Sequence, residues 1–183
     1  MKSLAMVMTV SVGVFMLTGC QSVKSAATTE AAAPPAPLQV TLIGSNGQNV
    51  GTAQLTSVQE GVQIDLQVSG LAPGPHGFHI HEKSLCEAPT FETAGAHFNP
   101  VKREHGFLNP KGAHAGDLPN LIVDEQGNGR LSTVTKAVTL LPDKINSLYK
   151  QGGTSLVIHE KADDLKTDPS GNSGKRIACG VVK

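Results

Sequence analysis

The sequence predicts an all-β domain, an antiparallel β-sandwich or flattened barrel of about eight strands with two long functional loops. Apolar and polar residues alternate with a period of two in several short segments. Gly (20) and Pro (11) are plentiful, and aromatic residues make up only 3% of the 183 residues. This composition favours short strands joined by turns over long helices, and the length suits one ordinary domain with tails.

The first residues have the layout of an export signal, which we expect to cover residues 1–19. Lys2 supplies a positive charge, and an apolar run follows from Leu4 to Leu17. This run is short for a membrane span, which needs roughly 20 residues. A short uncleaved anchor helix is the alternative. The sequence L-T-G-C that ends at Cys20 resembles the bacterial lipobox, in which the cysteine is lipidated and becomes the mature N-terminus.

The lipobox resemblance implies that Cys20 carries acyl chains and anchors the exported protein to the extracytoplasmic face of a bacterial cell membrane. Residues 20–37 are small and polar and end in prolines, so we expect a flexible tether there. Periodic apolar residues begin at Leu38. The folded domain is therefore expected to cover residues 38–183.

Strands are predicted where the alternation is clear and turn residues flank it. In residues 62–68, for example, Val, Ile and Leu alternate with Gln and Asp. Turn signals such as Ser-Asn-Gly and Gln-Gly-Asn-Gly separate these runs. The predicted strands lie near residues 38–43, 50–57, 62–69, 77–82, 120–124, 129–135, 154–160 and 176–182.

Two long stretches, residues 83–119 and 161–175, show no strand pattern. Loops of this length inside a compact domain are usually functional or disordered, and these two contain three of the seven histidines and many of the charged residues. A helical turn is a further prediction for residues 143–150. Fifteen basic and fifteen acidic residues cancel, so the charge gives no argument for nucleic acid as a partner.

Histidines are concentrated in one region, and six of the seven form a candidate metal centre. On the predicted strand 77–82, His79 and His81 point to one face and Phe78 and Ile80 to the other. The apolar pair belongs in the core, so the imidazoles should lie on the outer face, under whichever loop crosses it. The pair alone is weak evidence, because two histidines on a wet strand face are common.

Four more side chains strengthen the metal hypothesis: His97, His105, His114 and Asp117. Three nitrogens and one carboxylate oxygen suit tetrahedral zinc, and four protein ligands without a vacancy indicate a structural zinc. A polar loop with scattered histidines is the alternative. His159 lies on a late apolar strand, where it is either a further ligand or a satisfied core histidine. We expect His76 to be a surface residue in a turn.

These motifs together resemble the copper/zinc superoxide dismutase family from Leu38 to the C-terminus. The resemblance rests on Gly-Phe-His79-Ile-His81-Glu, His97-Phe-Asn-Pro, His105-x8-His114-x2-Asp117, His159-Glu-Lys-Ala-Asp163 and Gly-x-Arg176-x-Ala-Cys179-Gly. It implies a Greek-key arrangement of the strands. It also implies one copper and one zinc per chain.

The resemblance assigns the ligands. Copper would be held by His79, His81, His97 and His159, and zinc by His97, His105, His114 and Asp117. His97 would bridge the two ions as an imidazolate and take part in catalysis. Asp163 would be the carboxylate that links a copper histidine to a zinc histidine behind the ligands.

Two further features complete the expected site. Arg176 resembles the arginine that attracts and orients superoxide at the copper channel, although it could instead pair with a carboxylate at the start of a strand. If Cys20 is lipidated, Cys86 and Cys179 remain as an even pair in an exported protein. They would either form a disulfide that joins the ligand loop to the last strand or stay free thiols.

The resulting hypothesis is an exported, membrane-tethered enzyme that dismutates superoxide to O₂ and H₂O₂. A copper- or zinc-binding lipoprotein without activity is the alternative on the same fold, and an adhesive module is a weaker one. The complete copper set and Arg176 favour the enzyme. The sequence leaves open whether the chain is a monomer or a homodimer.

Overall fold

The structure is a computed structural model that describes residues 36–183. The expected export signal, Cys20 and almost all of the expected tether lie outside the described residues. Within 36–183 there is no helix of the length and apolar content that a membrane crossing requires. These residues form nine strands and one turn of 3-10 helix: β1 (Leu38–Gly44), β2 (Asn49–Val58), β3 (Gly61–Val68), β4 (Gly74–His76), β5 (Phe78–His81), η1 (Glu92–Ala94), β6 (Leu121–Val123), β7 (Gly129–Thr135), β8 (Thr154–His159) and β9 (Arg176–Val182).

The all-β prediction is confirmed, with two local differences. Strand β4 was not predicted, because its three residues, Gly-Pro-His, show no alternation and include two turn formers. The helical turn predicted for residues 143–150 is wrong, since this segment consists of turns and one isolated bridge from Ser147 to Thr139. Asp143 has a φ of 58°, in the left-handed region, which a right-handed helix cannot continue through.

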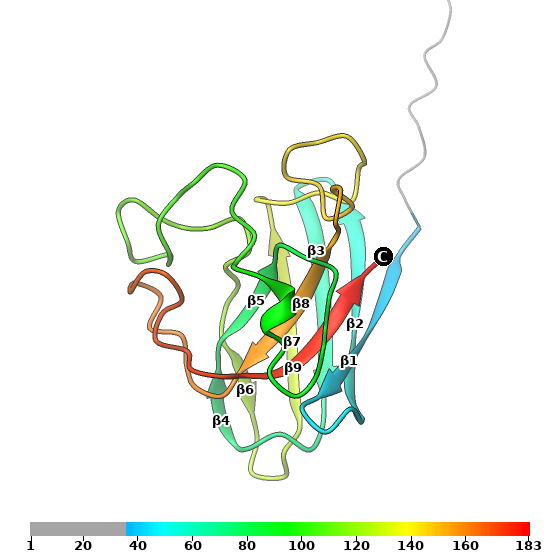
Figure 1. Ribbon diagram of the computed structural model, residues 1–183, viewed down its shortest axis with the longest axis vertical. Helices are drawn as coiled ribbons and strands as arrows, with labels where there is room; N and C mark the ends of the chain where they lie inside the picture. Colours follow the sequence, from blue (N-terminus) through cyan, green and yellow to red (C-terminus); the bar gives the residue numbers. More distant parts are fainter. Residues whose placement is uncertain (1–35) are drawn as a thin grey trace, which may run out of the picture. The chain divides into compact units, whose positions relative to one another are not determined.

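The strands form one antiparallel sheet in the order β4-β6-β7-β3-β2-β1-β9-β8-β5 (Figure 1). Neighbours in the sequence are not always neighbours in the sheet, because the chain passes from β3 over β7 and β6 to reach β4. Such crossovers are of the Greek-key type. Inside the sheet, alternate residues of β1, β2 and β3 form the core, for example Leu42, Leu55 and Ile64, which are all 0% exposed.

Gly77 nearly closes this sheet into a barrel. Strand β4 pairs with β6 at one end of the sheet, and β5 pairs with β8 at the other. Only Gly77 separates β4 from β5, and its N–H and C=O are hydrogen bonded to the main chain at Lys161 and His159, both at 2.8 Å. One continuous segment therefore joins the two ends of the sheet.

His76 supports this closure, so its prediction as a surface residue is wrong. It is 2% exposed, and its Nδ1 and Nε2 lie 2.7 and 2.8 Å from the carbonyl oxygens of His159 and Ala72. Whichever nitrogen carries the proton donates it to a main-chain carbonyl. A buried polar side chain needs such partners, and here one of them belongs to the strand that ends at the candidate metal centre.

Two long loops cover the outer face of the β5–β8 edge. Figure 1 shows the segment after η1 (green) and the segment before β9 (orange to red) on the same side of the barrel. They touch where the N–H of Leu108 donates to the carbonyl of Leu165 at 2.8 Å. Strand β8 is consequently buried on both faces, by the core inside and by the loops outside.

Candidate metal centre

Strand β5 presents His79 and His81 to the loop side of the sheet. Phe78 and Ile80, between them, are 0% exposed and belong to the barrel core. This alternation follows from the period of two in a strand. The two histidines are as buried as the core residues, at 0% and 1% exposed. The outer face of this strand, where the two histidines were predicted to lie, is therefore covered and not exposed to solvent.

The loop meets β5 along its free edge. Isolated bridges join His79 to Asp117 and His81 to His97. Between them, the main chain of Ile80 is hydrogen bonded to Gly116 and to Phe98, both at 2.8 Å. Main-chain pairing thus brings residues far apart in the sequence to the histidine face of the strand. His159, the last residue of the paired strand β8, lies on the same side.

Four histidines form the first group, which we call the four-histidine group: His79, His81, His97 and His159. One ring nitrogen from each lies within 4.8 Å of the others. The buried atoms His79 Nδ1, His81 Nε2, His97 Nε2 and His159 Nε2 have no hydrogen-bond partner. Leaving a buried polar atom unpaired costs about 1–3 kcal/mol. Four such atoms in one place fit a metal ion as their missing partner.

In three of these rings, the hydrogen bond of the second nitrogen, on the outer side of the group, determines which tautomer is present. Nδ1 of His81 donates to the carbonyl of Gly95 at 2.9 Å, and Nδ1 of His159 donates to the carbonyl of Gly174 at 3.2 Å. Nε2 of His79 donates to Asp163 Oδ2 at 2.8 Å. Carbonyl and carboxylate oxygens only accept, so each proton lies on this outer nitrogen. The unpartnered nitrogen of each of these three rings then carries a lone pair for a metal.

A second group, which we call the mixed group, contains His97, His105, His114 and Asp117. Asp117 Oδ1 lies 3.0 Å from His97 Nδ1, 3.0 Å from His105 Nδ1 and 3.3 Å from His114 Nδ1. The Nδ1 atoms of His97 and His114 are 3.4 Å apart. Zinc bonds of about 2.0 Å in a tetrahedron separate the ligand atoms by about 3.3 Å. The mixed group therefore fits zinc.

Two main-chain N–H groups orient the Asp117 carboxylate toward the three histidines of the mixed group. Its Oδ2 accepts from the N–H groups of Gly106 and His114, both at 2.9 Å. That leaves Oδ1 for the three imidazoles. Burial would raise the pKa of Asp117, but its contacts with His105 and the other histidines hold it well below the ordinary value. Asp117 is thus an anion at the centre of the mixed group.

His97 is common to both groups. Its Nδ1 lies in the mixed group, and its buried Nε2 lies in the four-histidine group without any hydrogen-bond partner. No other residue of the described chain belongs to both sets. A ring whose two nitrogens point at two cation-binding groups is suited to join two ions.

Asp163 lies behind both groups and is 3% exposed. Its carboxylate accepts from His79 Nε2 at 2.8 Å and from His105 Nε2 at 2.9 Å, so it connects a histidine of each group. Its own main chain is held by the side chain of Asn120 through two hydrogen bonds of 2.8 and 2.9 Å. Burial would raise the pKa of Asp163, but the hydrogen bonds from His105 and His79 keep it below its ordinary value.

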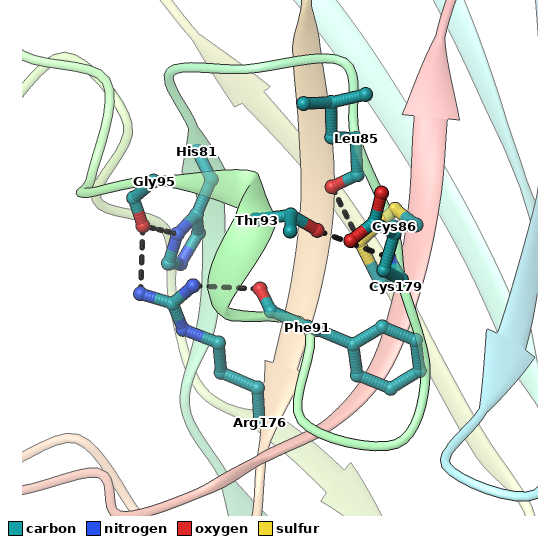
Figure 2. The surroundings of a disulfide bond; sticks show 9 residues. His81, Leu85, Cys86, Phe91, Thr93, Gly95, Arg176 and Cys179 are labelled. Carbon is teal, nitrogen blue, oxygen red and sulfur yellow. Dashed lines mark hydrogen bonds between the residues drawn. A yellow bond between two sulfur atoms is a disulfide. The ribbon is translucent and has the colours of Figure 1, made fainter.

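Arg176, at the start of β9, is half-buried beside the four-histidine group. Its guanidinium donates to the carbonyls of Phe91 at 2.7 Å and Gly95 at 2.6 Å. Figure 2 shows that the Gly95 carbonyl also accepts from His81. One oxygen therefore positions both the arginine and a histidine of the group. No carboxylate lies within ion-pair distance of Arg176 in the described chain, so that alternative does not hold.

A disulfide joins Cys86 to Cys179, 93 residues apart, and the free-thiol alternative is wrong. It attaches the loop that contains η1 to β9, three residues after Arg176 (Figure 2). Phe91 and Ala94 pack with Val157 and Cys179 in a small apolar cluster outside the barrel. The bond and this cluster hold in place the two carbonyls that Arg176 uses.

Comparison with known proteins identifies this arrangement. The family model for copper/zinc superoxide dismutase (SODC) matches residues 49–182. The chain belongs to the copper/zinc superoxide dismutase family. Superoxide dismutase [Cu-Zn] 1 of Aquifex aeolicus (strain VF5) is 51% identical over 143 residues, which cover 78% of this chain and 85% of that relative.

Solved structures of a SOD-like protein and of a superoxide dismutase agree with the fold. A SOD-like protein from Bacillus subtilis has a TM-score of 0.77 at 42% identity, over 79% of this chain and 97% of that one. The Cu/Zn superoxide dismutase from Brucella abortus has a TM-score of 0.65 at 28% identity, over 81% and 100% of the two chains. The reaction is dismutation of superoxide, and the family implies one copper and one zinc per chain.

Some residues of this superoxide dismutase site could not be found from the sequence. Asn120 clamps the main chain of Asp163, and Gly95 contributes only a carbonyl oxygen. Asp168 accepts from the main-chain N–H of His105 at 2.7 Å. Asn120 and Asp168 bind the main chain of another residue, and Gly95 acts through its own main-chain carbonyl. No residue pattern in a single sequence signals such contacts.

The metal-free protein should release a proton when it binds zinc but not when it binds copper. Burial disfavours a charged His105, but the carboxylates of Asp117 and Asp163 outweigh it and raise its pKa to about 9. Burial lowers the pKa of His97 to about 4 and that of His159 to about 3. At pH 7.5 His105 is therefore protonated, whereas His97 and His159 already have lone pairs.

Titration calorimetry at pH 7.5 in two buffers of different ionisation enthalpy would count these protons, with each metal added alone. We expect one proton released per zinc and a zinc affinity that rises up to tenfold per pH unit until about pH 9. Copper affinity should change little between pH 7 and 9. Zinc binding without proton release would contradict a protonated His105.

Proposed function

We propose that this superoxide dismutase works on the exported side of a bacterial membrane. In this proposal copper is held by His79, His81, His97 and His159, and zinc by His97, His105, His114 and Asp117. Arg176 and His97 are the catalytic residues, and Cys20 carries the lipid anchor. The observation that carries the site assignment is His97, whose two ring nitrogens belong to two different metal-binding groups.

When bound at the four-histidine group, copper would supply a one-electron couple that could accept an electron from one superoxide and donate one to the next. The balanced reaction consumes two superoxide anions and two protons and yields O₂ and H₂O₂. The chain must therefore attract an anion, orient it and deliver protons. Zinc has no redox chemistry and four protein ligands, so its role in the proposal is to order the loop and the shared ring.

Arg176 performs the first two tasks. Its guanidinium is fixed by two carbonyl acceptors, which use only part of its five N–H donors. The remaining donors and the positive charge are available to superoxide next to His81. Because burial reduces screening by water, a fixed charge there acts more strongly than one on the open surface.

His97 serves the third task, proton delivery, and Asp163 keeps the ligand histidines in place. Nε2 of His97 is buried and unpartnered in the described structure, so it is an atom that can hold one of the protons. Asp163 keeps the outer protons of His79 and His105 in place, which preserves the tautomers that the two groups need. The positions of these two side chains follow from the loops packed over β5.

Enzymatic function is tested with purified protein reconstituted with one copper and one zinc per chain. It should suppress the reduction of cytochrome c by a superoxide source, and removal of copper should abolish the effect. The alternative, a metal-binding lipoprotein without activity, requires full metal content with no suppression. The family relatives favour the enzyme.

Replacement of Arg176 tests its role in attracting superoxide. R176A should lower kcat/KM by about 10–100-fold at low ionic strength, since steering charges change association rates by this order. R176K should retain much of the rate because it keeps the charge. The matched control is R130Q on β7, an exposed arginine, which should leave kcat/KM unchanged. Equal activity of R176A and wild type would rule out a catalytic Arg176.

Three observations support the exported, lipid-anchored location. Residues 1–19 have the charge and apolar pattern of an export signal, and Cys20 ends a lipobox-like sequence. The Cys86–Cys179 disulfide is of the kind that persists in oxidising compartments.

The location is tested by replacing Cys20. In a bacterial host fed a labelled fatty acid, the wild-type chain should be labelled and sediment with membranes. The C20S chain should be unlabelled, because serine cannot form the thioether that lipidation requires. Equal labelling of both chains, or a wild-type chain that stays in the cytoplasm, would refute the proposed anchor.

A further inference from the structure

Four of the six candidate ligand histidines have an oxygen acceptor at the outer ring nitrogen, and a fifth, His97, turns its two nitrogens toward the two groups. His79, His105, His81 and His159 each place the outer nitrogen on a carboxylate or carbonyl oxygen at 2.8–3.2 Å. The sixth, His114, does not, because its Nε2 has no hydrogen bond in the described structure. The polar group that faces this nitrogen is the carboxylate of Asp168, at 3.7 Å.

Asp168 lies in the loop before β9, far from His114 in the sequence. The same oxygen that faces His114, Oδ1, also accepts from the main-chain N–H of His105 at 2.7 Å. One carboxylate oxygen therefore touches two members of the mixed group, and neither member belongs to the four-histidine group. The side chain of Asp168 is 49% exposed, so this contact is at the solvent edge of the site.

We propose that Asp168 is a positioning residue for zinc, acting through His105 and His114. This inference rests on the proposed zinc site. Its carboxylate fixes the main chain of His105 and places a negative charge beside the outer nitrogen of His114. A metal on the inner nitrogen of an imidazole makes the outer N–H more positive, so a carboxylate there stabilises the metal-bound ring.

Asp163 and Asp168 contact different sets of candidate ligand residues. Asp163 is buried and touches His79 and His105, one histidine from each group. Asp168 is at the solvent edge and touches residues of the mixed group alone. Loss of Asp168 should consequently weaken zinc and leave copper in place, which a general loosening of the loops would not do.

The test measures zinc affinity by competition with a chromogenic chelator, using the full chain loaded with copper and zinc. D168N keeps an oxygen that can accept from the His105 N–H but removes the negative charge. We expect it to bind zinc about 10–100-fold more weakly, the usual effect of losing a carboxylate behind a metal ligand. Its copper affinity and visible copper spectrum should match those of the wild type.

D164N is the matched control. Asp164 is an exposed acid of the same loop, and its carboxylate contacts only that loop, at the N–H groups of Lys166 and Thr167 and the side chain of Asn172. D164N should retain wild-type affinity for both metals. A second variant, D168A, removes the acceptor for the His105 N–H as well and should lose at least as much zinc affinity as D168N.

The outcomes separate the possibilities. If D168N binds zinc like the wild type, the inference is overturned, even if D168A binds weakly, because Asp168 would then only tether the loop. If D168N loses copper and zinc equally, the inference is also overturned. A wild-type chain that binds no zinc would overturn the proposed zinc site itself, a result distinct from a normal site that is indifferent to Asp168.

Discussion

The site depends on one imidazole whose two nitrogens face two different metal-binding groups. His97 turns Nδ1 toward Asp117 and two histidines, and Nε2 toward three other histidines. In a protein without bound ions this arrangement would leave buried polar atoms unpaired, at a cost that folding must offset. The rest of the domain forms a rigid scaffold that holds His97 and its neighbours in this arrangement.

This scaffold is rigid because main-chain pairing, not side-chain contact alone, joins its parts. Residues 97–98 and 116–117 pair with β5, and Gly77 joins the ends of the sheet beside His159. Side-chain carboxylates then connect residues of different segments, as Asp163 does by accepting hydrogen bonds from His79 and His105. Polar networks of this kind need every member satisfied, and the outer nitrogens of His79, His81, His105 and His159 each have an oxygen partner here.

The side of the site that contains Arg176 is held by loop packing. Arg176 is held by carbonyls of the loop around η1, and that loop is held by Phe91 packing and the Cys86–Cys179 disulfide. Because the Gly95 carbonyl binds both Arg176 and His81, the position of the charge and the orientation of a histidine are coupled. The loop therefore links the position of the Arg176 charge to the geometry of the four-histidine group.

The sequence by itself determined the strands, because a period of two is a local property, as in Val62, Ile64, Leu66 and Val68. It also determined which side chains can bind a metal, since residue type and motif order identify His79, His97 and Asp117. It failed for β4 and for residues 143–150, where short or irregular segments carry little periodic signal. His76 was misplaced for a similar reason, because its burial depends on strands far away in the chain.

Only the tertiary structure decided which nitrogen of each ring is free, that His97 lies in both groups, and that Asn120 and Asp168 support them. These are contacts between residues 14 to 84 positions apart in the sequence. A sequence lists the donors and acceptors of each residue but not their distances. The nitrogen that is left with a free lone pair depends on the partner across the ring, and that partner is brought there by the loops packed over the sheet.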